Sequence, residues 1–576
     1  MQVDNENNKN IESDYFLPQH AVINTNSTTT KLSVVFDGSC KTDIGLSLND
    51  VLLKGPTIQE ELITILARFR KHKFALSADV SKMFRQIWVD PQHRNYQKII
   101  WREDPSEPLR TYKLNTVTYD TVPASFLATG CLFKLAEEEY HIFPDACDAI
   151  KSDFYMDDYL GGSDTKDNAL KLRNSLMEVM LRGGFPLRKW MSNSTELLND
   201  MPGIGNKSMT IMELENKMTK ILGLLRCPER DVFNYKIEAI KLNDLSITKR
   251  NILYILSQIS SLFDPLGLVG PIVIRAKILM QKLWQLQCDW DNPVPIEVKN
   301  EWKNYLNSLH YLRELEVPLV PRYLGTEIDY EIQIHGFADA SLLAYGACLY
   351  IRCSSRDNVH VTKLICAKSK IAPLKVISLP RLELCATVIL ARLANKVLPK
   401  LKLNIKNKYF WTDSSITLAY IKSPSSKWKT FVAHRVSEIQ DITSLNEWNH
   451  VNTQDNPADP ISRGCRPDQI INNKLWWEGS HWLTDHFNKW PKSKINLNNS
   501  AIPEVKEKIV LLVELINENI IQKYSSWNKL LRVFAYCLRF IKIRVKKLKI
   551  GGPIQPEELQ DAEIIVIKIT VILLVK

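Results

Sequence analysis

Two adjacent aspartates, Asp157 and Asp158, stand between apolar and aromatic residues and are followed by Gly161 and Gly162. This pattern predicts a β-hairpin with the acids at its tip, between a buried strand and a returning strand. Ionised carboxylates in an apolar frame repel one another and are costly to desolvate, and a divalent cation removes that cost. The pair could therefore hold Mg²⁺ for phosphoryl or nucleotidyl transfer. A lone Asp-Asp, by contrast, would more often be an ordinary acidic turn.

A third acid, Asp79, ends a β-like run that begins at Phe74, and an amphipathic helical segment is predicted to follow it. An acid at the end of one strand and two at a hairpin tip is how a palm-type polymerase gathers its metal ligands. Such a site uses one metal to activate the primer 3′-hydroxyl group and another to stabilise the leaving pyrophosphate. We therefore expect the carboxylates of Asp79, Asp157 and Asp158 to converge within one metal-coordination shell.

A second set of acids lies in the C-terminal half of the chain. Asp339 and Asp413 end β-like runs, Glu383 lies in the first turns of a predicted helix, and Asp459 supplies a fourth acid. Three aspartates and one glutamate at strand and helix ends are the ligands of a two-metal nuclease. Scattered surface charge is the alternative, but all four acids come with matching local context. His450 is more simply explained as a packed or hydrogen-bonded strand histidine.

The sequence around these acids resembles that of a known family. The acid patterns themselves resemble a reverse transcriptase and a ribonuclease H. The flanking segments that narrow the family are Thr28–Asp37, Ser47–Asp50, Gly55–Ile58 and Leu114–Tyr119. Together they resemble the Pol polyprotein of BEL/Pao long-terminal-repeat retrotransposons, from about residue 15 to about residue 528.

The resemblance implies an α+β fold: a palm and fingers reverse transcriptase, followed by a ribonuclease H-like mixed five-stranded sheet with flanking helices. The expected domains are a disordered N-terminus (1–14), fingers and palm (15–228), thumb or connection helices (229–327), a ribonuclease H-like domain (328–466) and a segment leading toward an integrase (467–576). No His-His-Cys-Cys pattern and no further acid triad follow residue 466. A fragment of the polyprotein with incomplete fingers is therefore expected.

The resemblance also implies residue roles. Asp79, Asp157 and Asp158 match the polymerase metal ligands, and Asp339, Glu383, Asp413 and Asp459 match the ribonuclease H ligands in order. Phe84 matches the aromatic steric gate that excludes a 2′-hydroxyl group, with core packing as the alternative. Lys31 and Lys189 match basic residues near the incoming nucleotide, with a solvated surface position as the alternative. Ile221–Leu225 resembles the primer-grip turn.

Two residues depart from the family pattern in the stretch that lines the template and nucleotide pocket. Asp120 stands where the family usually has glycine, and Ser125 stands where it usually has proline. Glycine there allows close backbone approach, whereas aspartate adds a negative charge that faces a triphosphate. Either change could weaken polymerisation.

Composition agrees with an intracellular nucleic-acid-binding chain. The 576 residues suffice for three or four domains, and the net charge of +11 suits a nucleic-acid channel. The 11 cysteines include no Cys-x-x-Cys pair, which argues against structural zinc and against a disulfide scaffold. The N-terminus shows no signal peptide. The apolar run 564–575 is too short to span a bilayer and contains Lys568. A cytoplasmic location without membrane contact is expected, in virus-like particles if the element were intact.

The sequence therefore predicts an RNA-directed DNA polymerase with ribonuclease H activity that uses Mg²⁺ or Mn²⁺, two ions per active site. Its partners would be an RNA template, a DNA primer, deoxynucleoside triphosphates and an RNA–DNA hybrid, and its oligomeric state stays open. One alternative is a catalytically decayed nucleic-acid-binding remnant. Another is an aspartic peptidase, which Pao-type elements encode beside the reverse transcriptase. That chemistry needs Asp-Ser/Thr-Gly, which the sequences following Asp37, Asp339 and Asp413 do not supply.

Overall fold

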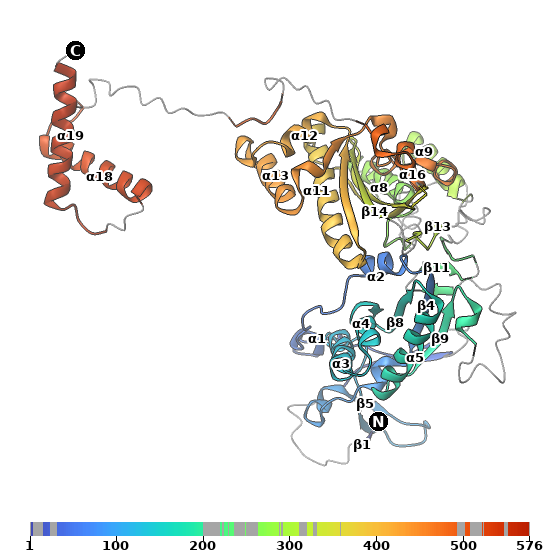
Figure 1. Ribbon diagram of the computed structural model, residues 1–576. Coiled ribbons are helices and arrows are strands. Elements are labelled where there is room, and N and C mark those ends of the chain that lie inside the picture. Colours follow the sequence, from blue (N-terminus) through green and yellow to red (C-terminus); the bar gives the residue numbers. More distant parts are fainter. Residues whose placement is uncertain are drawn as a thin grey trace. The chain divides into compact units, whose positions relative to one another are not determined.

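The computed structural model describes residues 2–3, 15–23, 31–199, 219–221, 224–228, 230–235, 248, 263–286, 289, 292–309, 311, 320–326, 331–357, 359–491, 502–506, 521, 523–546 and 551–574. The chain divides into two units, Met1–Val505 and Lys506–Lys576. The larger unit contains an antiparallel four-stranded sheet and a mixed five-stranded sheet, each with helices packed on it (Figure 1). The predicted α+β fold class is confirmed.

In the four-stranded sheet, β4 (Phe74–Val80) is an inner strand with a neighbour on each side. Its order is β7-β8-β4-β9, with β7 at Phe154–Tyr155, β8 at Asp158–Ser163 and β9 at Leu187–Ser192, and every pairing is antiparallel. Successive side chains of a strand point to opposite faces. Leu76 and Ala78 accordingly share a core with α3 (Ala124–Glu138), α4 (Pro144–Ser152) and α5 (Lys166–Arg182). Ala75 instead joins the core that contains α2 (Leu62–Phe69).

The helical segment predicted after Asp79 is present only as a short 3₁₀ helix. The segment forms a single 3₁₀ turn at Met83–Gln86, which starts after Lys82 with φ of 51° and ends at the extended residue Ile87. The backbone N–H of Val117 then donates to the carbonyl oxygen of Ile87 at 2.9 Å. Met83 and Ile87 are both buried, so their four-residue spacing imitated the apolar stripe of a helix.

Smaller sheets complete the N-terminal half of this unit. β2 (Gln19–Ile23) pairs with β3 (Leu32–Phe36). A second sheet has the order β1-β6-β5, with β1 at Gln2–Val3, β6 at Arg110–Lys113 and β5 at Lys98–Trp101. A third has the order β10-β11-β12-β13, at Thr219–Ile221, Leu224–Cys227, Val232–Asn234 and Val320–Pro321. The short helix α1 (Leu48–Val51) begins with a capping box from Ser47. The predicted primer-grip turn falls between β10 and β11, and residues 222–223 of it lie outside the described residues.

The five-stranded sheet has the order β16-β15-β14-β17-β18. The strands are β14 (Glu331–Ala340), β15 (Ala344–Ser354), β16 (His360–Ile371), β17 (Ile405–Thr412) and β18 (Trp448–His450). β14 pairs with β15 antiparallel and with β17 parallel, and β17 pairs with β18 parallel. The helices that follow these strands in sequence are α11 (Leu379–Val397), α12 (Ser415–Ile421), α13 (Thr430–Ile442) and α14 (Asp459–Arg463). The predicted ribonuclease H-like sheet is therefore present.

Segments on both sides of this sheet in sequence share its core. The helix α8 (Gly270–Gln285) supplies Ile272 and Leu279, and α9 (Ile296–Leu309) supplies Trp302. After residue 466, α15 (Pro467–Ile471) and α16 (Lys474–Glu478) continue the lobe, and Trp476 donates its indole N–H to the carbonyl oxygen of Leu268 at 2.9 Å. Residues predicted as connection and as the start of an integrase linker thus pack onto the ribonuclease H-like lobe.

In the part of the smaller unit that the structure describes, two helices, α18 (Trp527–Lys546) and α19 (Pro556–Leu574), pack through Leu530, Leu531 and Val566. Ion pairs join Arg539 to Glu558 and Lys542 to Asp561. Among the helices that the structure describes, none is both long and apolar enough to cross a bilayer.

Candidate functional site

Two of the predicted polymerase acids face each other across adjacent strands. Asp79 of β4 and Asp158 of β8 are directly paired residues, and directly paired side chains lie on the same face of a sheet. Tyr155 also pairs with Asp158, so the chain reverses at Met156, whose φ is 55°, and Asp157. The backbone N–H of Val80 donates to the carbonyl oxygen of Asp157 at 2.8 Å, which ties the turn to β4. The predicted hairpin with acids at its tip is formed.

The electrostatics of this hairpin favour a cation. Burial and the negative charges of Asp157 and Asp79 together raise the pKa of Asp158 to about 7, and Lys189 opposes that rise. Like charges that share a site disfavour ionisation, and a bound cation reverses that effect. A divalent cation beside these carboxylates would relieve the repulsion between them.

Lys189 reaches this cluster because β9 contains an irregularity. The pairing of β9 with β4 shifts register between Ser77 and Asp79, and Lys189 in the shifted stretch has φ of 51°. A bulge of this kind re-aims a side chain, and the Lys189 Nζ lies 2.6 Å from Asp79 Oδ2. The lysine predicted to contact the nucleotide thus neutralises one acid of the predicted metal site.

The other predicted nucleotide-binding residues lie in different surroundings. Phe84 is half-buried and packs against the ring of Tyr119, with ring centroids 6.5 Å apart. Arg85 lies over the same tyrosine ring at 5.4 Å. Lys31 is exposed at the bend before β3, on a different sheet from the three aspartates. The structure brings Phe84 next to the Tyr119-Asp120 stretch, and the roles of Phe84 and Lys31 stay predictions.

The second set of acids gathers at one end of the five-stranded sheet. Ala338 and Thr412 are paired residues of the parallel strands β14 and β17, so Asp339 and Asp413 follow at the same end. Asp459 begins α14, and Ser462 of that helix donates its hydroxyl group to Asp339 Oδ2. The Asn456 side chain donates to the carbonyl oxygen of Ala338 at 3.1 Å and so fixes the chain ahead of α14.

Glu383 approaches the same edge from α11. The hydroxyl group of Ser414, which follows Asp413, donates to Glu383 Oε2 at 2.5 Å. Burial and the charge of Asp413 raise the pKa of Glu383. Burial and the charges of Asp413 and Asp459 raise the pKa of Asp339 to about 7, although the Ser462 hydrogen bond and Arg463 oppose the rise. Asp413 therefore acts electrostatically on both Asp339 and Glu383, which places it centrally in the cluster.

His450 lies at the end of β18 beside this cluster. It pairs with Thr412, and its Nε2 atom lies 3.1 Å from the carbonyl oxygen of Asp413, a distance at which the ring donates a hydrogen bond. The interpretation of His450 as a hydrogen-bonded strand residue is confirmed.

Four of the acids have a protein partner: Asp79, Asp459, Glu383 and Asp339. Within the described part of the chain, no three acidic, histidine or cysteine side chains are oriented as a set that could hold one metal ion. The full convergence expected for Asp79, Asp157 and Asp158 is thus not seen in these side-chain orientations. Lys189 pairs with Asp79, and Arg463 pairs with Asp459 at 2.6 Å. These side chains would have to move away from the carboxylates for a metal ion to bind.

Sequence reasoning missed the partner residues. Ser414 follows Asp413 directly and is the N-cap of α12, and Ser462 comes three residues after Asp459. A serine this close to a predicted metal ligand is a sequence feature that could have indicated a hydrogen bond to an acid. The partners that come from distant segments gave no such signal, because strand pairing and helix docking alone bring them near.

One protein-family model matches part of the chain. Residues 248–414 match the Pao retrotransposon-like RNaseH-like domain. This range contains Asp339, Glu383 and Asp413 and ends before Asp459, and it confirms the resemblance to Pao-type retrotransposons for that segment. No curated protein matches the chain.

Two of the solved structures that are similar to the chain are foamy viral proteins. One is a foamy viral protease-reverse transcriptase, dRH, in complex with double-stranded DNA, with 12% identity over 76% of this chain and 65% of that chain and a TM-score of 0.45. Another is the foamy viral protease-reverse transcriptase in complex with an RNA/DNA hybrid, with 12% identity over 76% of this chain and 50% of that chain and a TM-score of 0.46. The chain therefore spans less than two thirds of either protein.

Proposed function

From the Pao retrotransposon-like RNaseH-like domain at residues 248–414, we propose that the chain is a retrotransposon RNA-directed DNA polymerase joined to a ribonuclease H. The observation that carries the polymerase half is the direct pairing of Asp79 with Asp158 beside Asp157 at a hairpin turn. The nuclease half is supported by Asp339 and Asp413 at the same end of adjacent parallel strands, with Asp459 and Glu383 approaching that end.

The residues of the polymerase cluster would divide the work as follows. Asp79, Asp157 and Asp158 would hold two Mg²⁺ or Mn²⁺ ions, which when bound supply charge stabilisation to the phosphoryl oxygens. Lys189, which pairs with Asp79, would exchange that contact for one with the triphosphate of an incoming deoxynucleotide. Phe84, which packs against the ring of Tyr119, would supply the apolar surface against which a deoxyribose packs.

The residues of the nuclease cluster would act on an RNA–DNA hybrid. Asp339, Glu383, Asp413 and Asp459 would hold two Mg²⁺ or Mn²⁺ ions there, which when bound supply a hydroxide nucleophile and stabilise the leaving oxygen. Ser414 and Ser462 orient two of these carboxylates through hydrogen bonds. Such supporting contacts fix the orientation of metal ligands and tune their basicity.

Two assays on the full chain test the proposal. We expect incorporation of dTTP on poly(rA)/oligo(dT) and cleavage of labelled RNA in an RNA–DNA hybrid, each with Mg²⁺ or Mn²⁺ and each lost in EDTA. A chain that binds primer–template but incorporates no nucleotide with either ion would contradict the polymerase half. Uncut hybrid under the same conditions would contradict the nuclease half.

A catalytically decayed nucleic-acid-binding remnant is a second candidate, and one observation favours it. Asp120, which stands where the family usually has glycine, has φ of 68° in the left-handed region. An L-residue there costs about 1–2 kcal/mol, somewhat less for aspartate, whereas glycine adopts it freely. The side chain of Asn49 also clamps this turn by donating to the carbonyl oxygen of Asp120 at 3.1 Å. The backbone is thus held in a shape suited to glycine.

Asp120→Gly should therefore raise nucleotide incorporation. Because Asp120 is exposed, solvent screens its charge, and we expect a gain of about twofold to fivefold. Stability should change by less than about 1 kcal/mol, since relief of backbone strain is offset by the greater freedom of glycine in the unfolded chain. The measurement is steady-state incorporation at matched protein concentration. Ser125→Pro, in the first turn of α3 where proline is tolerated, should add a smaller gain.

Asp120→Asn is the matched control for this prediction. It removes the charge, keeps the side chain, and tolerates the left-handed backbone. A gain in Asp120→Gly alone would point to the backbone, and an equal gain in both variants would point to charge. If wild type already incorporates as fast as both variants, decay at this position is disproved. Cleavage of hybrid should be the same in all three proteins.

A further inference from the structure

The turn that carries the polymerase acids is held from outside its own sheet. The Oε1 atom of Gln59 accepts a hydrogen bond from the backbone N–H of Met156 at 3.2 Å. Met156 lies between Tyr155 and Asp157, at the point where the hairpin reverses, and has φ of 55°. Gln59 is half-buried, and its contact fixes the backbone directly beside both tip aspartates.

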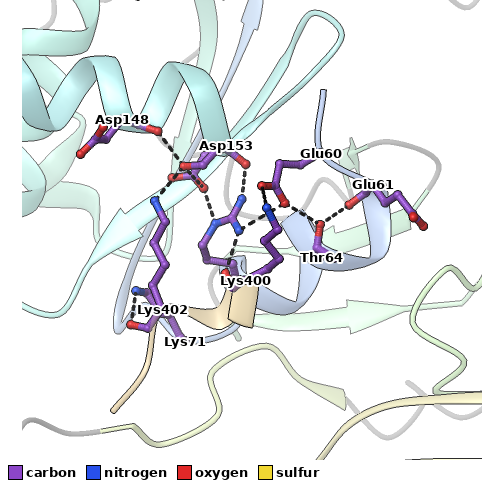
Figure 2. A network of polar contacts seen from close by, with 10 residues as sticks. Glu60, Glu61, Thr64, Lys71, Asp148, Asp153, Lys400 and Lys402 are labelled. Atoms are coloured by element: carbon purple, nitrogen blue, oxygen red, sulfur yellow. Dashed lines mark hydrogen bonds and ion pairs between the residues drawn. The ribbon is translucent and has the colours of Figure 1, made fainter. Parts of the chain in front are cut away.

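The residues that follow Gln59 are bound to the ribonuclease H-like lobe. Lys400 Nζ lies 2.6 Å from Glu60 Oε1, and Lys396 Nζ lies 2.6 Å from Glu61 Oε1 and 2.7 Å from its Oε2. Lys396 belongs to α11, the helix that also carries Glu383, and Lys400 lies in the 3₁₀ turn Leu398–Leu401 that follows it. Figure 2 shows Lys400 extended toward Glu60. One end of the helix therefore carries a nuclease acid, and the other end grips the segment that holds the polymerase turn.

The base of the hairpin is tied to the same place. The buried side chain of Arg68 donates through Nε to Asp153 Oδ1 at 2.6 Å, through Nη1 to the carbonyl oxygen of Lys400 at 2.8 Å, and also to the carbonyl oxygen of Ser152. The carbonyl oxygen of Asp153 accepts a hydrogen bond from the backbone N–H of Leu160 at 2.9 Å, which closes the hairpin. Tip and base of the hairpin are both connected to the segment around Lys400.

The connections differ in what their loss would do. Arg68 and Asp153 form a buried charged pair, and removing one partner of such a pair unfolds proteins rather than shifting one turn. Glu61 lies at the surface end of the network, where ion pairs are weak and their loss is tolerated, whereas the half-buried Glu60 also lies 4.0 Å from Arg68. Gln59 makes a neutral contact of ordinary strength. The informative substitutions are therefore at Gln59 and at the lysines.

We propose that Gln59 is a positioning residue for the acid-bearing turn of the polymerase hairpin, and that Lys396 and Lys400 of the ribonuclease H-like lobe set its position through Glu61 and Glu60. The expected effect on nucleotide incorporation rests on the proposed function. The hydrogen bond between Gln59 and the Met156 amide does not depend on it. The polymerase turn is thus held in place by the nuclease lobe, even when the nuclease site itself is inactive.

Hydrogen exchange at the Met156 amide tests whether Gln59 holds the turn, and it requires no enzymatic activity. In the full chain, Gln59→Leu keeps the side-chain size and removes the acceptor, and the exchange rate of a peptide spanning 154–158 should rise about threefold to tenfold. Gln59→Glu retains an acceptor oxygen and should restore protection. Unchanged exchange in Gln59→Leu would overturn the proposal.

The lysine arm is tested by charge reversal. Lys396→Glu should increase exchange of the same peptide about twofold to fivefold, the size expected for loss of an exposed ion pair, and adding Glu61→Lys should reverse the change. Lys406→Glu is the matched control, because it breaks another exposed ion pair of the same lobe, with Glu331 at 2.9 Å. An equal increase in the control variant, or no reversal in the double variant, would overturn the role of Lys396.

Activity supplies the second readout. Gln59→Leu should lower kcat for incorporation about fivefold with little change in KM for the nucleotide, and raise the Mg²⁺ concentration needed for half-maximal rate. Hybrid cleavage should stay unchanged, since the nuclease acids are untouched. If wild type itself incorporates nothing, the proposed polymerase function fails, while the exchange experiment still decides whether Gln59 holds the turn. A higher KM for the nucleotide with an unchanged kcat would overturn the positioning role.

Discussion

Asp158→Asn should reduce nucleotide incorporation by about a thousandfold or more and leave the metal-free protein as stable as wild type or more stable. The lost carboxylate would remove metal-dependent stabilisation of the transition state, which is worth several kcal/mol, and each 1.36 kcal/mol is tenfold in rate. Asparagine has the same shape, so the pairing of residue 158 with Asp79 and Tyr155 should persist. The measurement is single-turnover extension of a labelled primer.

The stability half of this prediction follows from the pKa of Asp158. Its value of about 7 in the folded chain exceeds the ordinary 3.8, because burial and two neighbouring aspartates disfavour the charged form. Between about pH 4 and pH 7 the unfolded chain loses this proton and the folded chain keeps it, so stability falls as pH rises through that window. The asparagine variant lacks this penalty. Thermal unfolding in EDTA should therefore show no difference near pH 4 and a more stable variant at pH 8.

A surface aspartate gives the matched control. Asp148 is exposed on α4 of the same lobe, and Asp148→Asn removes one negative charge without touching the hairpin acids. That variant should extend primers at the wild-type rate. If Asp158→Asn extends primers within tenfold of wild type, the carboxylate does not hold a metal ion. If instead the variant loses stability at pH 8, the acid is a structural residue.

The hairpin shows what sequence could and could not predict. Apolar flanks, two adjacent acids and a glycine pair predicted a strand, a turn and a returning strand, and the structure has them at Phe154–Tyr155 and Asp158–Ser163. Those features are local, so periodicity and turn residues are enough to predict them. The contact of Lys189 with Asp79 depends on an irregular register in β9, which leaves no trace in the apolar pattern.

The same limit explains why the helical segment after Asp79 is shorter than predicted and why no role was assigned to Gln59. Met83 and Ile87 are buried at helical spacing, yet a left-handed residue at Lys82 shortens the segment to one turn. Gln59 lies 97 residues from Met156 in sequence, and only the docking of α2 against β8 brings them together. Contacts across such separations are set by tertiary packing, which single-sequence reasoning cannot rank. The segments after residue 466 were likewise assigned by resemblance and not by their apolar side chains.

The nuclease lobe shows a parallel division. Strand ends predicted the positions of Asp339 and Asp413, and the parallel pairing of β14 with β17 brings those ends together. The orienting hydroxyl groups of Ser414 and Ser462 emerge only once α12 and α14 are in place. Beside burial, the charge of Asp413 raises the pKa of both Asp339 and Glu383, so Asp413 lies close to both acids. That central position makes it the sharpest test of the nuclease half.

Asp413→Asn should lower cleavage of an RNA–DNA hybrid by about a thousandfold or more while hybrid binding in EDTA stays within about twofold, because the lost step is metal-assisted chemistry. The backbone of residue 413 should stay in place, since its carbonyl oxygen still accepts the hydrogen bond from His450. With one negative charge gone, the pKa of Asp339 should fall from about 7, which titration of that carboxyl group by infrared spectroscopy can detect.

Asp441→Asn, an exposed position on α13, is the matched control and should cleave like wild type. Primer extension by Asp413→Asn should also match wild type, because that activity depends on a separate cluster. Cleavage by Asp413→Asn at the wild-type rate would refute the metal-binding role of this acid, and a parallel loss of hybrid binding would assign it to substrate contact instead.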